Sequence, residues 1–121
     1  MAGEALFLGW GPVVRGREQL ALTVFQESIA YYGALQQDGQ IDGFDTFLLA
    51  PHSGDLGGFI MMRGEQSKLD AVRSSPEFLR IVTRAGAVVD NVGVVSAYTG
   101  DALGQMMGIF GEVSQGVPQA R

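Results

Sequence analysis

Four short segments of the chain are apolar at most consecutive positions instead of alternating between apolar and polar residues. A strand with one face in water shows that alternation, whereas a strand covered on both faces reads as an apolar run. The four segments span residues 5–10, 44–49, 59–62 and 92–98. A chain this short has to cover both faces of its sheet, and a second copy of itself is the simplest cover. The pattern therefore predicts an obligate dimer.

Between these segments, apolar residues recur at helical spacing. Over residues 16–38, a stripe formed by Leu20, Val24, Tyr31 and Leu35 predicts an amphipathic helix. Gly39 follows this stripe and suits the left-handed conformation that ends many helices. The pattern of the first half of the chain thus predicts a strand, a helix and a second strand.

The second helical region is interrupted. Leu69 and Val72 mark a first short piece, and Ser75 then offers an N-cap hydroxyl. Pro76 suits the first position of a new helix, and Gly86 ends its apolar repeat. We therefore expect two consecutive helices separated at Ser75.

Strands are expected over residues 5–10, 41–50, 57–63 and 87–98, the last with a bulge at Asp90–Asn91 or at Gly93. A final helix follows residues 99–101. Its apolar side consists of Leu103, Met106, Met107, Phe110 and Val113, and its adjoining flank of Gly104, Gly108 and Gly111. Each glycine costs a helix interior about 1 kcal/mol, so this helix is either weak or packed closely against another backbone. Residues 115–121 are expected to form a flexible tail.

The resulting order is β-α-β-β-α-β-α. It predicts one α+β domain over residues 1–121 with the ferredoxin-like βαββαβ topology and an extra C-terminal helix. In that topology the helices cover one face of a four-stranded sheet. The other face then meets the sheet of a second copy, which gives a homodimeric α+β barrel.

The composition restricts the partners, cofactors and cellular location that we expect for this protein. Apolar residues make up 46% of the chain and charged residues 17%, so the polar surface is thin. The net charge of −5 and the single Lys68 argue against nucleic acid. The chain has no cysteine and one histidine, which argues against thiolate and His-rich metal sites, while a carboxylate site stays open. We expect no metal and no cofactor. No apolar run approaches the ~20 residues that span a bilayer, and Glu4 stands where a signal peptide carries basic residues; we expect a cytoplasmic protein.

Several segments resemble small dimeric α+β barrel proteins of unknown function of an actinobacterial type. They are residues 63–78 (RGEQSKLDAVRSSPEF), 84–90 (RAGAVVD), 8–11 (LGWG) and 16–18 (GRE). The likeness spans about residues 5–115 and rests on structural motifs. The wider superfamily includes cofactor-independent quinone-forming monooxygenases and haem-degrading enzymes. Those enzymes use Asn, Trp and His at defined places, and we do not map such a set onto this chain.

The segment from Gly11 to Glu18 nearly matches a phosphate-binding loop between a strand and a helix. Such a loop requires a lysine and then a serine or threonine, and Arg17 and Glu18 stand in those places. The match therefore fails for nucleotides. Arg15 and Arg17 at a helix N-terminus remain a candidate site for a small anion, with solvated or ion-paired arginines as the alternative.

His52 is the only imidazole and so the only ordinary proton shuttle at neutral pH. It lies in a turn rich in Pro, Ser and Gly. Three interpretations remain open: an exposed spectator, a contact with the partner copy, and a weak candidate for catalysis.

Trp10, Arg63 and Tyr98 end three different strands, where we expect them to meet and bind a ligand. Phe59, Met61 and Arg63 share one strand face, and an arginine on such a face needs an anion. Asp45 is the alternative partner, which would make the arginine structural.

Two classes of function follow. The first is a soluble homodimeric module that has a structural role or binds a small apolar or anionic ligand. The alternative is a cofactor-independent monooxygenase or isomerase acting on an aromatic or polyketide-like substrate. In that case Trp10 and Tyr98 would pack the substrate, Arg63 would bind an anionic oxygen and His52 would act as base.

Overall fold

The computed structural model describes residues 4–118, and its elements follow the expected order. The strands are β1 (Glu4–Trp10), β2 (Gly43–Leu48), β3 (Gly58–Arg63) and β4 (Gly93–Tyr98). The helices are α1 (Glu18–Gln37), α2 (Gln66–Ser74), α3 (Pro76–Gly86) and α4 (Gly100–Gln115).

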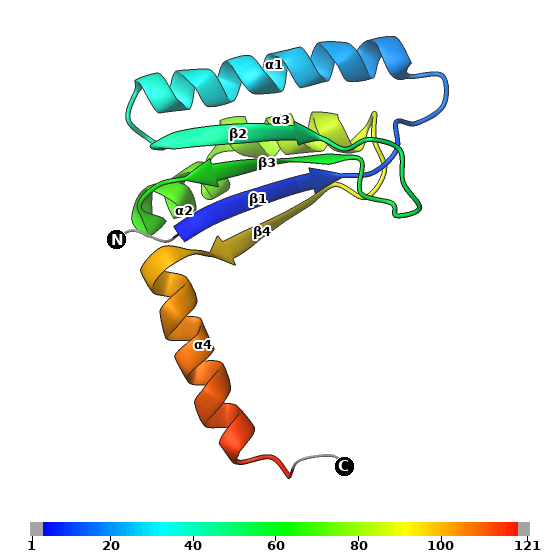
Figure 1. Cartoon of the computed structure of the whole chain (residues 1–121). Helices are drawn as coiled ribbons and strands as arrows, with labels where there is room; N and C mark the ends of the chain where they lie inside the picture. The colour runs from blue at the N-terminus through cyan, green and yellow to red at the C-terminus, as the bar shows by residue number, and fades with distance from the viewer. Residues whose placement is uncertain (1–3, 119–121) are drawn as a thin grey trace.

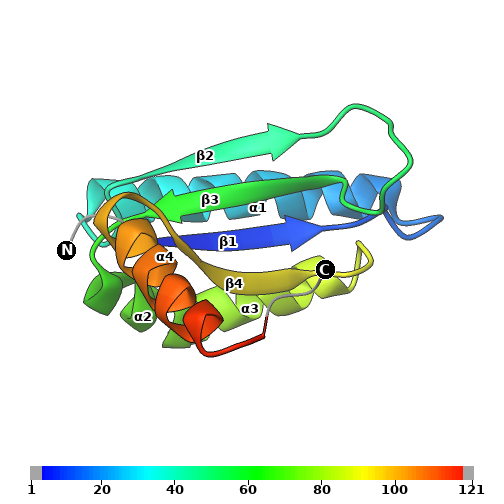
Figure 2. The ribbon, with the colours of Figure 1, turned by 60° about the horizontal axis from the view of Figure 1, so that its bottom comes forward.

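The four strands form one antiparallel sheet in the order β2-β3-β1-β4. Helices α1, α2 and α3 lie on one face of this sheet (Figure 1). In Figure 2 the underside of the view in Figure 1 comes forward, and the strands lie in front of α1 and α3. We call that side the open face. The βαββαβ order expected from the sequence is confirmed.

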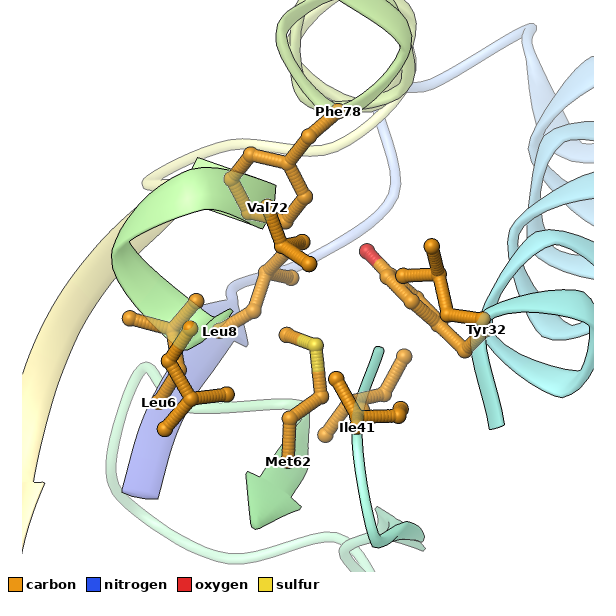
Figure 3. Packing of buried hydrophobic residues seen from close by; sticks show 10 residues of the cluster. Leu6, Leu8, Tyr32, Ile41, Met62, Val72 and Phe78 are labelled. Atoms are coloured by element: carbon orange, nitrogen blue, oxygen red, sulfur yellow. The ribbon is translucent and has the colours of Figure 1, made fainter. Parts of the chain in front are cut away.

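The core lies between the sheet and the helices. Alternate residues of β1 and β3 point toward the helices and meet buried side chains of α1, α2 and α3 (Figure 3). The buried cluster comprises Leu6, Leu8, Tyr32, Leu35, Ile41, Ile60, Met62, Leu69, Val72 and Phe78. Burial of apolar area is the main force that holds this layer on the sheet.

The open face is apolar as well. The ring of Phe59 on β3 stacks with Phe7 of β1 at a centroid distance of 5.1 Å and with Phe47 of β2 at 4.8 Å. Met61 and Val95 lie on the same face in the strand register. The strands are thus apolar on both sides, as the sequence pattern predicted.

The inner stripe of α1 differs from the expected one. The buried residues are Val24, Ser28, Tyr32 and Leu35, whereas Leu20 is 47% exposed. Positions spaced by four along a helix drift slowly around its axis, so the line that faces the sheet passes through Tyr32 rather than Tyr31. The expected place of Leu20 on the stripe is therefore wrong.

The signals that start and stop the helices act as predicted. The Ser75 hydroxyl accepts a hydrogen bond from the backbone N–H of Phe78 at 3.2 Å, and Pro76 occupies the first turn of α3. Gly39 after α1 has a φ of 76°, in the left-handed region. These local interactions set the break between α2 and α3 and the end of α1.

The fourth strand is shorter than expected, because β4 begins only at Gly93. Asn91 has a φ of 58°, a turn conformation that ends regular pairing before the strand starts. The backbone of Asp90 is held instead by Pro12, whose carbonyl accepts its N–H at 2.9 Å. The expectation of a strand over residues 87–98 is therefore wrong in its first half.

Helix α4 stands apart from the rest of the chain. It leaves the end of β4 and points away from the sheet on the side opposite α1 (Figure 1). The helix runs to Gln115, and of the tail expected over residues 115–121, residues 119–121 lie outside the described part.

Candidate functional site

A cavity of about 340 Å³ lies between α1, α3 and the helix-facing side of the sheet, partly open to solvent. The sheet contributes Leu8, Trp10 and Ile60, and the two helices contribute side chains that include Phe25 and Ile81. The walls are hydrocarbon and aromatic almost throughout. Cavities of this kind bind small organic molecules.

Small side chains on the facing helices leave this space unfilled. Ala21 and Ser28 of α1 and Ala85 of α3 all line the cavity. The two helices are also tied together, because the guanidinium of Arg84 on α3 binds the carboxylate of Glu27 on α1 at 2.8 Å. The gap between the helices is thus built into the layer rather than left by loose packing.

The polar groups that line the cavity are few, and two of them have partners. The Glu18 carboxylate accepts a hydrogen bond from the backbone N–H of Gly16 at 3.2 Å. The Ser28 hydroxyl donates to the carbonyl of Val24 at 2.7 Å. Among the described residues, no lysine, arginine or histidine contributes to the wall.

Tyr32 is the exception. Its side chain is fully buried, and its hydroxyl has no hydrogen-bond partner within residues 4–118. In Figure 3 the hydroxyl oxygen lies among Leu8, Val72 and Phe78, which offer only carbon atoms. Burial raises the pKa of Tyr32 above its ordinary value, and the nearby Tyr31 adds to the rise. The hydroxyl therefore stays neutral and keeps its proton to donate.

The structure does not bring Trp10, Arg63 and Tyr98 together. Along β1, Trp10 pairs with Gly58 at one end of the sheet, whereas Arg63 pairs with Ala5 and Tyr98 with Glu4 at the other. At about 3.3 Å per residue, this register separates Trp10 from the other two by roughly 17–20 Å. Within one chain, the expected meeting of these residues is wrong.

Of these three residues, Trp10 alone lines the cavity, where its ring packs edge-on against Phe25 at a centroid distance of 6.1 Å. Arg63 lies on the open face and forms an ion pair with Asp45. Tyr98 is exposed at the end of β4, an edge strand. The structural partner proposed for Arg63 is thus present.

His52 lies in the loop between β2 and β3 and does not line the cavity. Its Nδ1 accepts a hydrogen bond from the backbone N–H of Gly54 at 2.9 Å, and its Nε2 lies 2.7 Å from the carbonyl oxygen of Leu56. Both ring nitrogens are therefore engaged within the loop. This arrangement fits a residue that shapes the loop.

The two arginines before α1 also lie outside the cavity wall. The Arg17 guanidinium donates to the carbonyl of Ala87, the C-cap residue of α3. A cation at that end of a helix is favoured by the helix dipole. Arg17 is thus engaged in joining α1 to α3, and the role of Arg15 as an anion ligand stays a prediction.

The sequence analysis missed the polar groups of the cavity. Ser28 and Tyr32 lie one helical turn apart on the buried side of α1, and two hydroxyls at that spacing within an apolar stripe were the available signal. Glu18 was considered only as part of a phosphate loop. Within residues 4–118, no three His, Cys, Asp or Glu side chains lie close enough together to hold a metal ion.

Comparisons with solved structures show what this arrangement resembles. A dimeric ferredoxin-like protein of unknown function from Jannaschia sp. CCS1 matches with a TM-score of 0.61 and 17% identity, over 80% of this chain and 100% of its own. The chain has a ferredoxin-like fold. The resemblance to small dimeric proteins of this fold is thereby confirmed.

Two further structures extend the comparison. A ferredoxin-like DABB family protein from Mesorhizobium loti matches with a TM-score of 0.57 and 12% identity, over 78% of this chain and 94% of its own. SnoaB, a cofactor-independent oxygenase from Streptomyces nogalater, matches with a TM-score of 0.55 and 18% identity, over 82% and 95% respectively. No family model and no curated protein matches the chain.

Helices that cross a bilayer have about 20 consecutive, mostly apolar residues. Over residues 4–118, none combines the length and the apolar character of a membrane-spanning helix.

Proposed function

We propose that this protein is a homodimer that binds a small, uncharged, largely apolar molecule in the cavity between α1, α3 and the sheet. The observation that carries the proposal is the cavity itself, at about 340 Å³. A cavity of ~150 Å³ already holds a benzene ring, and ligand sites usually measure ~300–1,000 Å³. The space therefore suits a molecule of two or three rings or a comparable chain.

The charge of the lining selects the class of ligand. An ionised group moved from water into an apolar site needs a partner of opposite charge, or it carries a large desolvation cost. Among the described residues that line the wall, Glu18 alone has a charged side chain. Of the two kinds of ligand expected from the sequence, the apolar one fits this cavity and the anionic one does not.

The homodimer is supported by the open face. Its aromatic row of Phe7, Phe59 and Phe47 is an apolar surface on the face opposite to α1, α2 and α3. Contiguous exposed apolar surface of this kind marks an interaction site. The protein from Jannaschia with the same fold is described as dimeric.

A matched pair of fluorescent probes tests the ligand class. N-phenyl-1-naphthylamine is neutral, and 8-anilinonaphthalene-1-sulfonate has the same ring system with an anionic group. We expect the neutral probe to bind at least tenfold more tightly than the sulfonate. Equal binding of the two probes, or none of the neutral one, would contradict the proposal.

A substitution within the cavity locates the binding. Ala21→Phe places a ring in the space and should abolish the neutral probe's fluorescence enhancement. Ala30→Phe is the control, because Ala30 lies on α1 but is exposed and outside the cavity wall. Enhancement that survives Ala21→Phe would place the probe elsewhere on the protein.

The alternative function is oxygenation or isomerisation without a cofactor. The observation that favours it is the similarity in fold to SnoaB, which is a cofactor-independent oxygenase. Of the residues assigned to this chemistry from the sequence, Trp10 lines the cavity, whereas His52, Arg63 and Tyr98 do not. The Glu18 carboxylate, which lines the cavity, is the candidate acid or base for this chemistry.

Oxygen uptake distinguishes the two functions. With 1,5-dihydroxynaphthalene as the probe, a binding module consumes oxygen no faster than buffer containing the probe alone. A protein-dependent rate that Ala21→Phe abolishes would favour the enzyme.

A cytoplasmic location stays a prediction from the sequence.

A further inference from the structure

Helix α4 has a large apolar surface that the rest of residues 4–118 does not cover. Among the elements of the chain it packs chiefly against the end of β4, the strand it follows. Its exposed apolar side chains are Leu103, Met106, Met107, Ile109, Phe110 and Val113. Its two charged residues, Asp101 and Glu112, lie near its two ends. Between these ends the exposed side chains of α4 are apolar apart from Gln105, and within residues 4–118 they are not covered by another element.

Such a helix is not stable by itself in water. Isolated helices of fewer than ~12–15 residues are marginal even when rich in alanine. α4 has 16 residues and includes four glycines, of which Gly104, Gly108 and Gly111 are interior and cost about 1 kcal/mol each. Its helical form therefore depends on packing against a surface that the described part of its own chain does not supply.

The direction of α4 identifies that surface. The helix leaves the sheet on the side of the open face, away from α1 (Figure 1; Figure 2). At about 1.5 Å per residue it is roughly 24 Å long, whereas sheets packed face to face lie ~10 Å apart. An arm of this length reaches past any second sheet that packs on the open face.

We propose that α4 docks on a second copy of this chain, as an arm that extends beyond the contact between the two sheets. The inference rests on the proposed homodimer, and the dimeric protein of the same fold supports the choice of occupant. In a twofold dimer each copy gives one arm and receives one. At Gly104 and Gly108 an added Cβ would meet no described atom within 4 Å beyond the neighbouring backbone of α4 itself, so the partner's backbone has room to approach.

Photocrosslinking of the full-length protein tests the docking. p-Benzoylphenylalanine replaces Phe110, and copies with and without an affinity tag are mixed before irradiation. We expect a covalent dimer that joins one tagged and one untagged copy. The same probe in place of Leu79, an exposed residue on the outer side of α3, is the control and should give no covalent dimer.

A second measurement gives the contribution of α4 to the stability of the dimer. The double substitution Phe110→Ser and Val113→Ser removes two exposed apolar side chains from α4 and should raise the dimer dissociation constant at least tenfold, because each buried side chain of this size contributes substantially to association. Light scattering over a dilution series gives the constant.

The outcomes separate the two proposals. A protein that is dimeric by light scattering but gives no crosslink from position 110, with an unchanged dissociation constant in the double variant, overturns the docking of α4 alone. A protein that is monomeric at micromolar concentration overturns the homodimer and the arm together.

Discussion

At the scale of single residues, Tyr32 both stabilises the core, through its ring, and destabilises it, through its unpaired hydroxyl. A buried donor without an acceptor costs about 1–3 kcal/mol, and the Tyr32 hydroxyl has no partner among the described residues. Its ring nevertheless packs well, against Tyr31 at a centroid distance of 5.3 Å and against Phe44 at 5.9 Å. The aromatic ring thus stabilises the core, while the oxygen opposes it.

Removing this oxygen should stabilise the ligand-free protein. Tyr32→Phe keeps the ring and deletes the unpartnered donor, so we expect the free energy of unfolding to rise by about 1 kcal/mol. Chemical denaturation at neutral pH measures the change. Tyr31→Phe is the control at the partly exposed neighbour and should change the free energy by less than half as much. A loss of stability in Tyr32→Phe would show that the hydroxyl has an acceptor.

The same hydroxyl makes stability depend on pH in alkali. Because burial raises the pKa of Tyr32 in the folded state, this tyrosine ionises near pH 10 in the unfolded chain but stays protonated in the folded one. Unfolding then releases a proton, so this contribution to stability is present below pH 10 and falls above it by up to about 1.4 kcal/mol per pH unit. Unfolding curves from pH 9 to 11 should show a shallower decline for Tyr32→Phe, and identical slopes would contradict this account.

At the scale of elements, the junction between α2 and α3 depends on one hydroxyl. The Ser75 side chain caps α3 through the N–H of Phe78, a residue that is buried in the core. Ser75→Ala should therefore lower the free energy of unfolding by about 1 kcal/mol. The neighbouring Ser74→Ala is the control, because the Ser74 hydroxyl is exposed and bonds only to the carbonyl of Asp70 in its own helix. Equal effects of the two substitutions would argue against the cap.

The elements that the sequence predicted well are those with strong local signals. Ser75 and Pro76 mark the start of α3, and Gly39 marks the end of α1, because each acts through backbone geometry that its own residue type favours. The start of β4 was wrong, since the apolar residues 87–89 look like strand, but Val88 and Asp90 are held by hydrogen bonds to residues 11–14. These hydrogen bonds join parts of the chain that are distant in sequence, so they produce no periodic pattern of apolar residues.

The candidate site was predicted less well for the same reason. Trp10, Arg63 and Tyr98 each end a strand, but which face and which end of the sheet they occupy depends on the register between strands. The cavity depends on small residues of α1 and α3 that face each other, such as Ala21 and Ala85. Neither relation is visible in the local pattern of one segment.

At the scale of the whole molecule, the open face is expected to hold the dimer together. Phe59 lies in the middle of its aromatic row. Phe59→Asp would place a carboxylate in an apolar contact, so the variant should be monomeric by light scattering at concentrations where the unmodified protein is dimeric. Leu79→Asp is the control, an equally polar change at an exposed residue on the helix side. A dimeric Phe59→Asp variant would exclude the open face as the interface.

Native mass spectrometry with N-phenyl-1-naphthylamine tests the central claim most directly, because it reports assembly and ligand binding in one experiment. The chain has a mass of 12.9 kDa. We expect a dimer that retains at most two probe molecules, one for each cavity, and an Ala21→Phe dimer that retains none. A monomer, an unmodified dimer that retains no probe, or an Ala21→Phe dimer that retains as much probe as the unmodified protein would contradict the account.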